Sequence, residues 1–150
     1  MMLSRNFSLA EATKSQAALR IGIDNTPPPE VIERLRLTAE AILQPVRDHF
    51  QIPFTPSSWY RSEQVNRLAG SKETSQHILG YAVDFEVPGV PNMELATWIR
   101  NNLQFDQLIL EYWAPDDPAA GWVHCSYISY ARNRRKVLRF DGKTYQGGLV

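Results

Sequence analysis

The first fifty residues carry the hydrophobic spacing of helices. Ser8 and Glu11 form a Ser-x-x-Glu capping box, which predicts a short helix over residues 8–20 that ends near Gly22. A second predicted helix starts after Thr26, its expected N-cap. Its apolar positions recur every three or four residues and give one buried face; they are Val31, Leu35, Ala39, Ile42 and Val46.

Pro45 lies late in this second helix. Proline lacks the backbone N–H that an interior helical position donates, and its ring clashes with the preceding turn. We therefore expect a kink or a break at this position.

The rest of the chain reads as short strands with two further helices. Period-two alternation predicts strands, and three- and four-residue spacing predicts helices. The expected helices span 61–68, ending at Gly70, and 93–103, capped by Asn92. The expected strands are 81–87, 107–111 and 122–127, with a last strand or hairpin over 137–145 that turns at Asp141-Gly142.

Helices come first in this order and strands gather later. That order favours an α+β domain in which N-terminal helices pack on a mostly antiparallel sheet. A chain of 150 residues suits a single domain over residues 1–150, with a helical part at about 1–50 and a sheet-bearing part at about 51–145.

Composition narrows the function classes. Lys and Arg number 16 and Asp and Glu number 16, so the net charge is zero and a nucleic-acid partner is not expected. The single cysteine, Cys125, excludes an intrachain disulfide. No apolar run is long enough to span a membrane, and the first residues lack the apolar core of a signal peptide. We expect synthesis in the cytoplasm, no membrane partner and a monomer.

Three residues with metal-binding side chains stand in unusual places. Asp84 lies inside the apolar strand predicted at 81–87, where an uncompensated carboxylate is unfavourable. His77 ends the polar loop before that strand, and His124 lies inside another apolar strand. If the two strands are neighbours, the three side chains converge as a metal site with an open position. The spacing alone also allows Asp84 to pair with a buried arginine such as Arg61.

The stretch from Ser75 to Phe85 reads Ser-x-His-x-x-Gly-x-Ala-x-Asp-Phe. This pattern resembles the signature of the M15 zinc peptidases, the group of D-Ala-D-Ala carboxypeptidases and phage peptidoglycan peptidases. Residues 57–62 resemble the Ser-Gly-Tyr-Arg-Ser segment of that family, with Trp59 in place of glycine, and residues 122–124 resemble its second-histidine strand. The resemblance extends over about residues 6–140.

The resemblance implies a fold of the Hedgehog/DD-peptidase type and one Zn²⁺ bound by His77, Asp84 and His124. It also implies that Arg61 binds or polarises the substrate. A hydrogen bond from Ser75 to the substrate, or to the loop of His77, fits the same scheme.

The general base is where the sequence departs from this family. Many members carry an acidic residue three positions before the second histidine, and here that residue is Gly121. Glu111, which ends an apolar strand, is the best replacement, because compact phage-type members share its Gln-Leu-Ile-x-Glu segment. Asp116 and Asp117, in a proline-rich loop, are the fallback.

Together these features predict a zinc peptidase that cleaves the peptide stems of bacterial peptidoglycan, either as a carboxypeptidase or as an endopeptidase. A phage or prophage protein of this kind acts on the cell wall after release or as part of the virion. The alternative is a catalytically silent wall-binding or phage structural module on the same zinc scaffold, and Gly121 is the feature in its favour.

Overall fold

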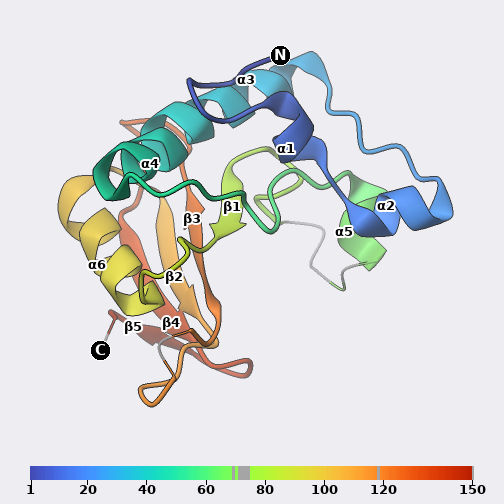
Figure 1. Cartoon of the computed structure of the whole chain (residues 1–150). Helices are drawn as coiled ribbons and strands as arrows, with labels where there is room; N and C mark the ends of the chain where they lie inside the picture. The colour runs from blue at the N-terminus through green and yellow to red at the C-terminus, as the bar shows by residue number, and fades with distance from the viewer. Residues whose placement is uncertain (69, 71–74, 118, 150) are drawn as a thin grey trace.

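A five-stranded sheet forms the centre of the computed structural model, which describes residues 1–68, 70, 75–117 and 119–149 (Figure 1). The strands are β1 (Ala82–Phe85), β2 (Gln107–Glu111), β3 (Trp122–Ser126), β4 (Lys136–Phe140) and β5 (Tyr145–Gly147). Their order across the sheet is β1-β3-β2-β4-β5. Only the β2–β4 pairing within this sheet is parallel, which confirms the predicted α+β class with a mostly antiparallel sheet.

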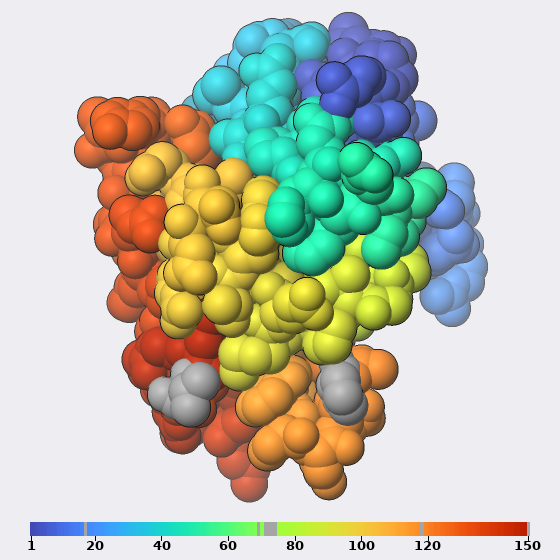
Figure 2. All heavy atoms as spheres, turned by 60° about the vertical axis from the view of Figure 1, so that its left-hand side comes forward, coloured from blue at the N-terminus to red at the C-terminus, as the bar shows by residue number. Residues whose placement is uncertain are grey.

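Helices cover one face of the sheet. These are α3 (Pro29–Thr38), η1 (Ala39–Leu43), α4 (Gln44–Phe50) and α6 (Asn92–Asn102). In the space-filling view α4, in teal, and α6, in yellow, lie side by side (Figure 2), and the His49 ring stacks on Trp98 at 4.4 Å between ring centroids. None of the helices in the described part of the chain has the length and apolar character needed to cross a membrane.

The helix predicted over residues 8–20 is in fact two short helices. Here α1 (Leu9–Thr13) starts with the predicted capping box of Ser8 and Glu11, and α2 (Gln16–Ile21) starts with its own cap. The Ser15 side chain accepts a hydrogen bond from the Ala18 backbone N–H, which favours a new helix start over continuation. The third small helix, α5 (Glu63–Leu68), lies within the predicted range of 61–68.

Two predicted N-caps are wrong. Thr26 donates its hydroxyl to Asp24, and α3 begins only after Pro28, because the prolines favour an extended entry and then occupy the first turn. Asn92 is the first helical residue of α6 instead of its cap. Its side-chain amide donates to Glu86 and to the carbonyl oxygens of residues 120 and 121, so it holds the loop before β3.

The long amphipathic helix continues past Pro45 through a wider turn. Residues 39–43 form a π-helical segment, in which the Gln44 N–H donates to the Ala39 carbonyl oxygen. Such a turn accommodates a proline whose ring would clash with the carbonyl of an ordinary α-turn. The apolar face remains in register, since the five predicted apolar positions from Val31 to Val46 are all buried.

The two faces of the sheet have different chemistry. Every second side chain of β1, β2 and β3 points into the hydrophobic core beneath the helices. These residues are Val83, Phe85, Leu108, Leu110, Val123 and Cys125. The intervening residues, which include Asp84, Glu111 and His124, point to the other face. The period-two pattern therefore sorts the polar side chains onto the face that the helices leave open.

Asp106, just before β2, joins three parts of the chain. Its carboxylate is fully buried and accepts hydrogen bonds from the Gln76 side chain, the Arg134 backbone N–H and the Arg134 guanidinium. Burial alone would raise the pKa of Asp106, but the Arg134 and Gln76 hydrogen bonds outweigh it and hold this pKa below its usual range. Gln76 precedes His77, so this carboxylate anchors the loop that carries His77.

Replacing Asp106 with asparagine should destabilise the fold by about 2 kcal/mol at neutral pH, because an amide cannot accept all of these bonds. The folded pKa of Asp106 lies below the unfolded one, so its contribution is present above about pH 4 and is lost as the pH falls through the folded pKa. Urea denaturation of Asp106→Asn at pH 7 and pH 3 measures both effects. The exposed Asp116→Asn is the matched control, and an equal loss at both pH values would contradict the assignment.

Candidate metal centre

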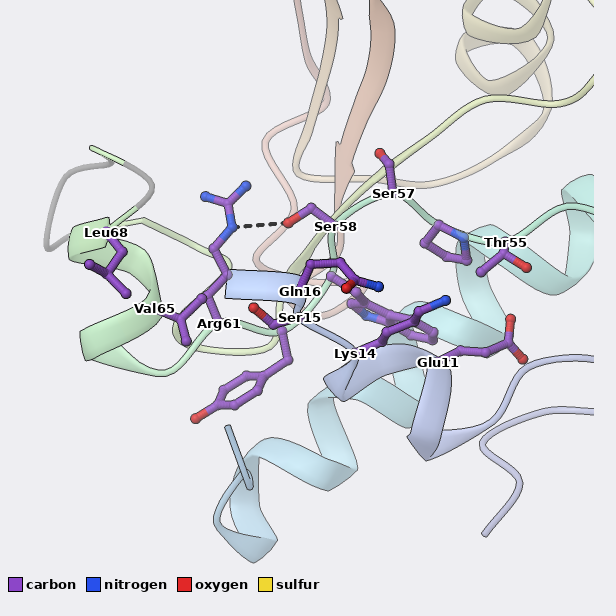
Figure 3. Close-up of a pocket in the computed structure, with 13 residues that line it drawn as sticks. Glu11, Lys14, Ser15, Gln16, Thr55, Ser57, Ser58, Arg61, Val65 and Leu68 are labelled. Atoms are coloured by element: carbon purple, nitrogen blue, oxygen red, sulfur yellow. Dashed lines mark hydrogen bonds between the residues drawn. The ribbon is translucent and has the colours of Figure 1, made fainter. Parts of the chain in front are cut away.

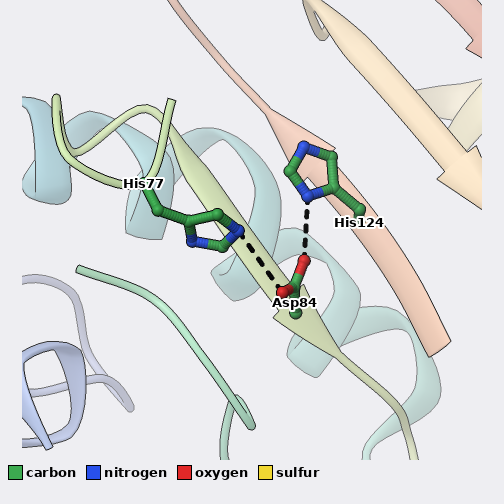
Figure 4. Close-up of side chains that lie close together, drawn as sticks. All are labelled: His77, Asp84 and His124. Carbon is green, nitrogen blue, oxygen red and sulfur yellow. Dashed lines mark hydrogen bonds and ion pairs between the residues drawn. The ribbon is translucent and has the colours of Figure 1, made fainter. Parts of the chain in front are cut away.

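The β1–β3 register places Asp84 directly opposite His124. The Asp84 Oδ1 atom lies 2.8 Å from His124 Nδ1, and its Oδ2 atom lies 3.3 Å from His77 Nε2 (Figure 4). One potential ligand atom from each of the three residues lies within 4.8 Å of the other two. The convergence of His77, Asp84 and His124 expected from the sequence is thus present in the structure.

His77 is oriented by main-chain groups of the loop and of the segment before α5. Its Nδ1 atom lies 2.7 Å from the Trp59 carbonyl oxygen, so Nδ1 carries the proton and donates it there. The His77 backbone N–H donates to the Ser75 hydroxyl, and its carbonyl oxygen accepts from the Arg61 N–H. This arrangement leaves the lone pair of Nε2 directed at Asp84.

The contact between His77 and Asp84 fits a bound cation. Burial lowers the pKa of His77 and favours its neutral form, although Asp84 opposes this. A neutral Nε2 lone pair then faces a carboxylate oxygen, and two acceptors at 3.3 Å repel each other unless a positive charge lies between them. Tetrahedral zinc with bonds of about 2.0 Å separates its ligand atoms by about 3.3 Å. The donor set of two imidazoles and a carboxylate is therefore suited to Zn²⁺.

Arg61 reaches the same cluster. Its Nη2 atom lies 3.5 Å from Asp84 Oδ2, and its Nε donates to the Ser58 hydroxyl at 2.9 Å. The Asp84–Arg61 pairing that the spacing allowed is therefore present, but it is longer than both histidine contacts. Ser58 forms a backbone bridge with Asp84, which fixes the segment that carries Arg61 along β1.

Glu111 and the three residues of the cluster line the same pocket, whereas Asp116 and Asp117 are not among the residues that line it. Burial raises the pKa of Glu111, and the Asp84 charge adds to the rise, while His124 and Arg61 oppose it. A carboxyl group with a raised pKa beside a metal-binding cluster is suited to proton transfer.

Position 121 has no room for an acidic side chain. Gly121 adopts φ 74°, and a Cβ atom there would lie 1.8 Å from the Glu111 carbonyl oxygen. The strand end that carries Glu111 thus occupies the space into which a side chain at 121 would project. Backbone packing therefore excludes an acidic side chain at position 121, whereas Glu111 lines the pocket.

The pocket on this face has a volume of about 700 Å³. It contains every site residue expected from the sequence: Arg61, Ser75, His77, Asp84, Glu111 and His124. Four aromatic residues that we did not predict as site residues also line it: Tyr112, Trp122, Phe140 and Tyr145. The sequence signal for them was the position of an aromatic residue at or next to four strand ends.

Arg61 also borders a second pocket of about 490 Å³ (Figure 3). That pocket lies between the first two helices and the extended segment at 55–61, with Lys14, Ser15 and Ser58 in its wall. It contains none of the three residues of the metal-binding cluster. The chemistry of the described residues is therefore concentrated in the larger pocket.

A family of peptidases matches most of the chain. The sequence model described as Peptidase M15 matches residues 5–126. This range includes the histidine and aspartate cluster, Arg61 and Glu111, and it ends before β4 and β5. No curated protein matches the chain.

The cluster should bind one Zn²⁺ per chain, and binding should raise the melting temperature, because the metal compensates the buried Asp84 charge. His77→Ala and His124→Ala should each lose zinc, as measured by elemental analysis after dialysis. His49→Ala is the matched control, since its ring stacks on Trp98 outside the cluster. Full zinc occupancy in the His77→Ala, His124→Ala double variant would rule out this ligand set.

Proposed function

The chain belongs to the peptidase M15 family, and on that basis we propose that it is a zinc peptidase that cleaves peptide stems of bacterial peptidoglycan. The observation that carries the proposal is the cluster of His77, Asp84 and His124, which lines one pocket together with Glu111 and Arg61. We further propose that the domain has the Hedgehog/DD-peptidase fold and that the protein is of phage or prophage type, acting on the cell wall after release or within the virion.

Each polar residue of the pocket has a distinct role in this proposal. Zn²⁺ bound to the three ligands would supply Lewis acidity, polarising a peptide carbonyl and making a water molecule more acidic. Glu111 accepts a proton from the attacking water through its carboxylate and later delivers it to the leaving amine. Arg61 binds a substrate carboxylate or the developing oxyanion through its guanidinium, and the Ser75 hydroxyl orients the loop of His77 or the substrate.

The alternative of a catalytically silent wall-binding or structural module rested on Gly121. Glu111 lines the same pocket, and its carbonyl oxygen lies where a side chain at 121 would begin. A carboxylate is therefore present despite the glycine, and we prefer the peptidase.

Incubation of the purified protein with defined muropeptides, with and without a chelator, tests the proposal. Mass spectrometry of the products identifies the cleaved bond. Release of a terminal alanine identifies a carboxypeptidase, and cleavage within the stem or cross-link identifies an endopeptidase. A zinc-loaded protein that binds these peptides without cleaving any of them would be a silent module.

Glu111→Gln should lower turnover about 10²–10⁴-fold while zinc content stays unchanged, because the amide keeps the shape of the side chain and loses its basicity. Steady-state kinetics on the cleaved muropeptide, together with metal analysis, measure both quantities. Asp116→Asn and Asp117→Asn are the controls and should keep their turnover. If either control loses activity while Glu111→Gln keeps it, the base lies in the loop.

Restoring an acid at position 121 should not rescue the enzyme. Gly121→Glu introduces a Cβ atom into the Glu111 backbone, and the positive φ adds strain, so we expect lower stability. The double variant Glu111→Gln, Gly121→Glu should remain inactive. Recovery of turnover in this double variant would show that position 121 can still supply the base.

A further inference from the structure

Four aromatic rings form one continuous wall of the site pocket. Tyr112 contacts Trp122 at 5.1 Å and Phe140 at 5.6 Å between ring centroids, and Phe140 stacks on Tyr145 at 4.3 Å. All four residues line the pocket that contains Glu111 and His124. We call this set of rings the aromatic wall.

The aromatic wall is only partly covered by the protein. Tyr112 is 46% exposed and Tyr145 is 58% exposed, although both lie against other rings. Aromatic surface that is exposed within a pocket is typical of a ligand-binding surface. The hydroxyl groups of the two tyrosines also give the wall hydrogen-bonding atoms.

The backbone holds Tyr112 in an uncommon conformation. Its φ is 56°, in the left-handed region that a bulky residue rarely adopts. Gly142, in the turn between β4 and β5, lies against it: a Cβ atom there would be 2.8 Å from Tyr112 Cε1. The Tyr112 ring is therefore held against the β4–β5 hairpin. A strained backbone conformation such as that of Tyr112 is common at binding sites.

Two of the rings come from outside the family-matched part of the chain. Phe140 and Tyr145 belong to the β4–β5 hairpin, whereas the match ends at residue 126. The hairpin thus adds its own aromatic surface to a pocket whose metal-binding residues lie within the matched range. This is the expected location of a feature that sets specificity on a shared catalytic scaffold.

The aromatic wall and Arg61 lie toward different edges of the sheet. The segment of Arg61 bridges to β1, at one edge of the sheet, whereas the wall is built on β3, β2, β4 and β5. The pocket consequently has a cationic group toward the β1 edge and aromatic rings on the strands that follow, and Glu111 and His124 line the same pocket. A substrate that fills it carries an anionic group on one side and an uncharged, CH-rich face on the other.

We propose that the aromatic wall binds a sugar ring of the glycan strand, so that the protein prefers stems that are still attached to their sugars. This inference rests on the proposed function. Peptidoglycan stems consist mainly of alanine and charged residues, whose side chains are too small or too polar to cover several rings. The CH face of a pyranose is broad enough to stack on them, and its hydroxyls can bond to the tyrosine hydroxyls.

Two ligands that differ only in the sugar test the proposal. One is a disaccharide-linked stem peptide, and the other is the same peptide without the disaccharide. Calorimetric titration into zinc-loaded Glu111→Gln, which keeps the ligands intact, should show roughly tenfold tighter binding of the sugar-bearing form. Adding Tyr145→Ala or Tyr112→Asn should remove most of that difference, and asparagine tolerates the left-handed backbone at position 112.

Tyr130→Ala, at a tyrosine that is 78% exposed and not among the pocket residues, is the matched control and should keep the preference. Tyr112→Phe and Tyr145→Phe retain the rings and should keep most of it. Equal affinities for the two ligands before any tyrosine is changed, or a preference that survives loss of both rings, would overturn the inference.

A direct titration separates this inference from the proposed function. The disaccharide alone should bind the protein and lose affinity in Tyr145→Ala, whether or not any muropeptide is cleaved. Turnover of muropeptides without disaccharide binding would leave the peptidase standing and refute the sugar site. Disaccharide binding without turnover of any muropeptide would support the sugar site and refute the peptidase.

Discussion

The buried carboxylate of Asp84 is the constraint around which this molecule is arranged. It lies within a sheet strand, contacts two imidazoles and a guanidinium, and is bridged by its backbone to the segment of Arg61. Burial would raise the pKa of Asp84, but its contacts with the imidazoles, that of His124 above all, hold this pKa below the usual range. A permanent negative charge in a buried position requires positive partners. The surrounding strands and loops supply a guanidinium, which is itself positive, and two imidazoles, which can bind a cation.

Much of this arrangement could be predicted because it depends on local periodicity. Alternation in the strands of Asp84 and His124 correctly predicted which side chains share a face, and the capping box correctly predicted the start of the first helix. The helix starts at Thr26 and Asn92 were wrong, since tertiary hydrogen bonds and neighbouring prolines decided them. The Ser15 cap that divides the first helix is, by contrast, a local signal.

The parts of the site that could not be predicted depend on contacts between distant segments. No sequence pattern indicates that the Glu111 carbonyl oxygen fills the space beside Gly121, or that a C-terminal hairpin packs Gly142 against Tyr112. Asp106 is similar: its partners Gln76 and Arg134 lie about thirty residues away on either side in the sequence. Such contacts follow from strand order, in which β4 joins the sheet beside β2 instead of beside its neighbour in sequence, β3.

The bond between His77 and the Trp59 carbonyl oxygen has a consequence for how the site tolerates sequence change. A side-chain partner for the imidazole could be lost by one substitution, whereas every amino acid brings the same carbonyl group. The tautomer of His77 is therefore independent of the identity of residue 59, provided that the backbone path is kept. Trp59 itself is buried in the hydrophobic core, so its side chain packs there while its carbonyl group orients His77. A substitution at residue 59 can thus change the packing of the core without changing the hydrogen bond that orients His77.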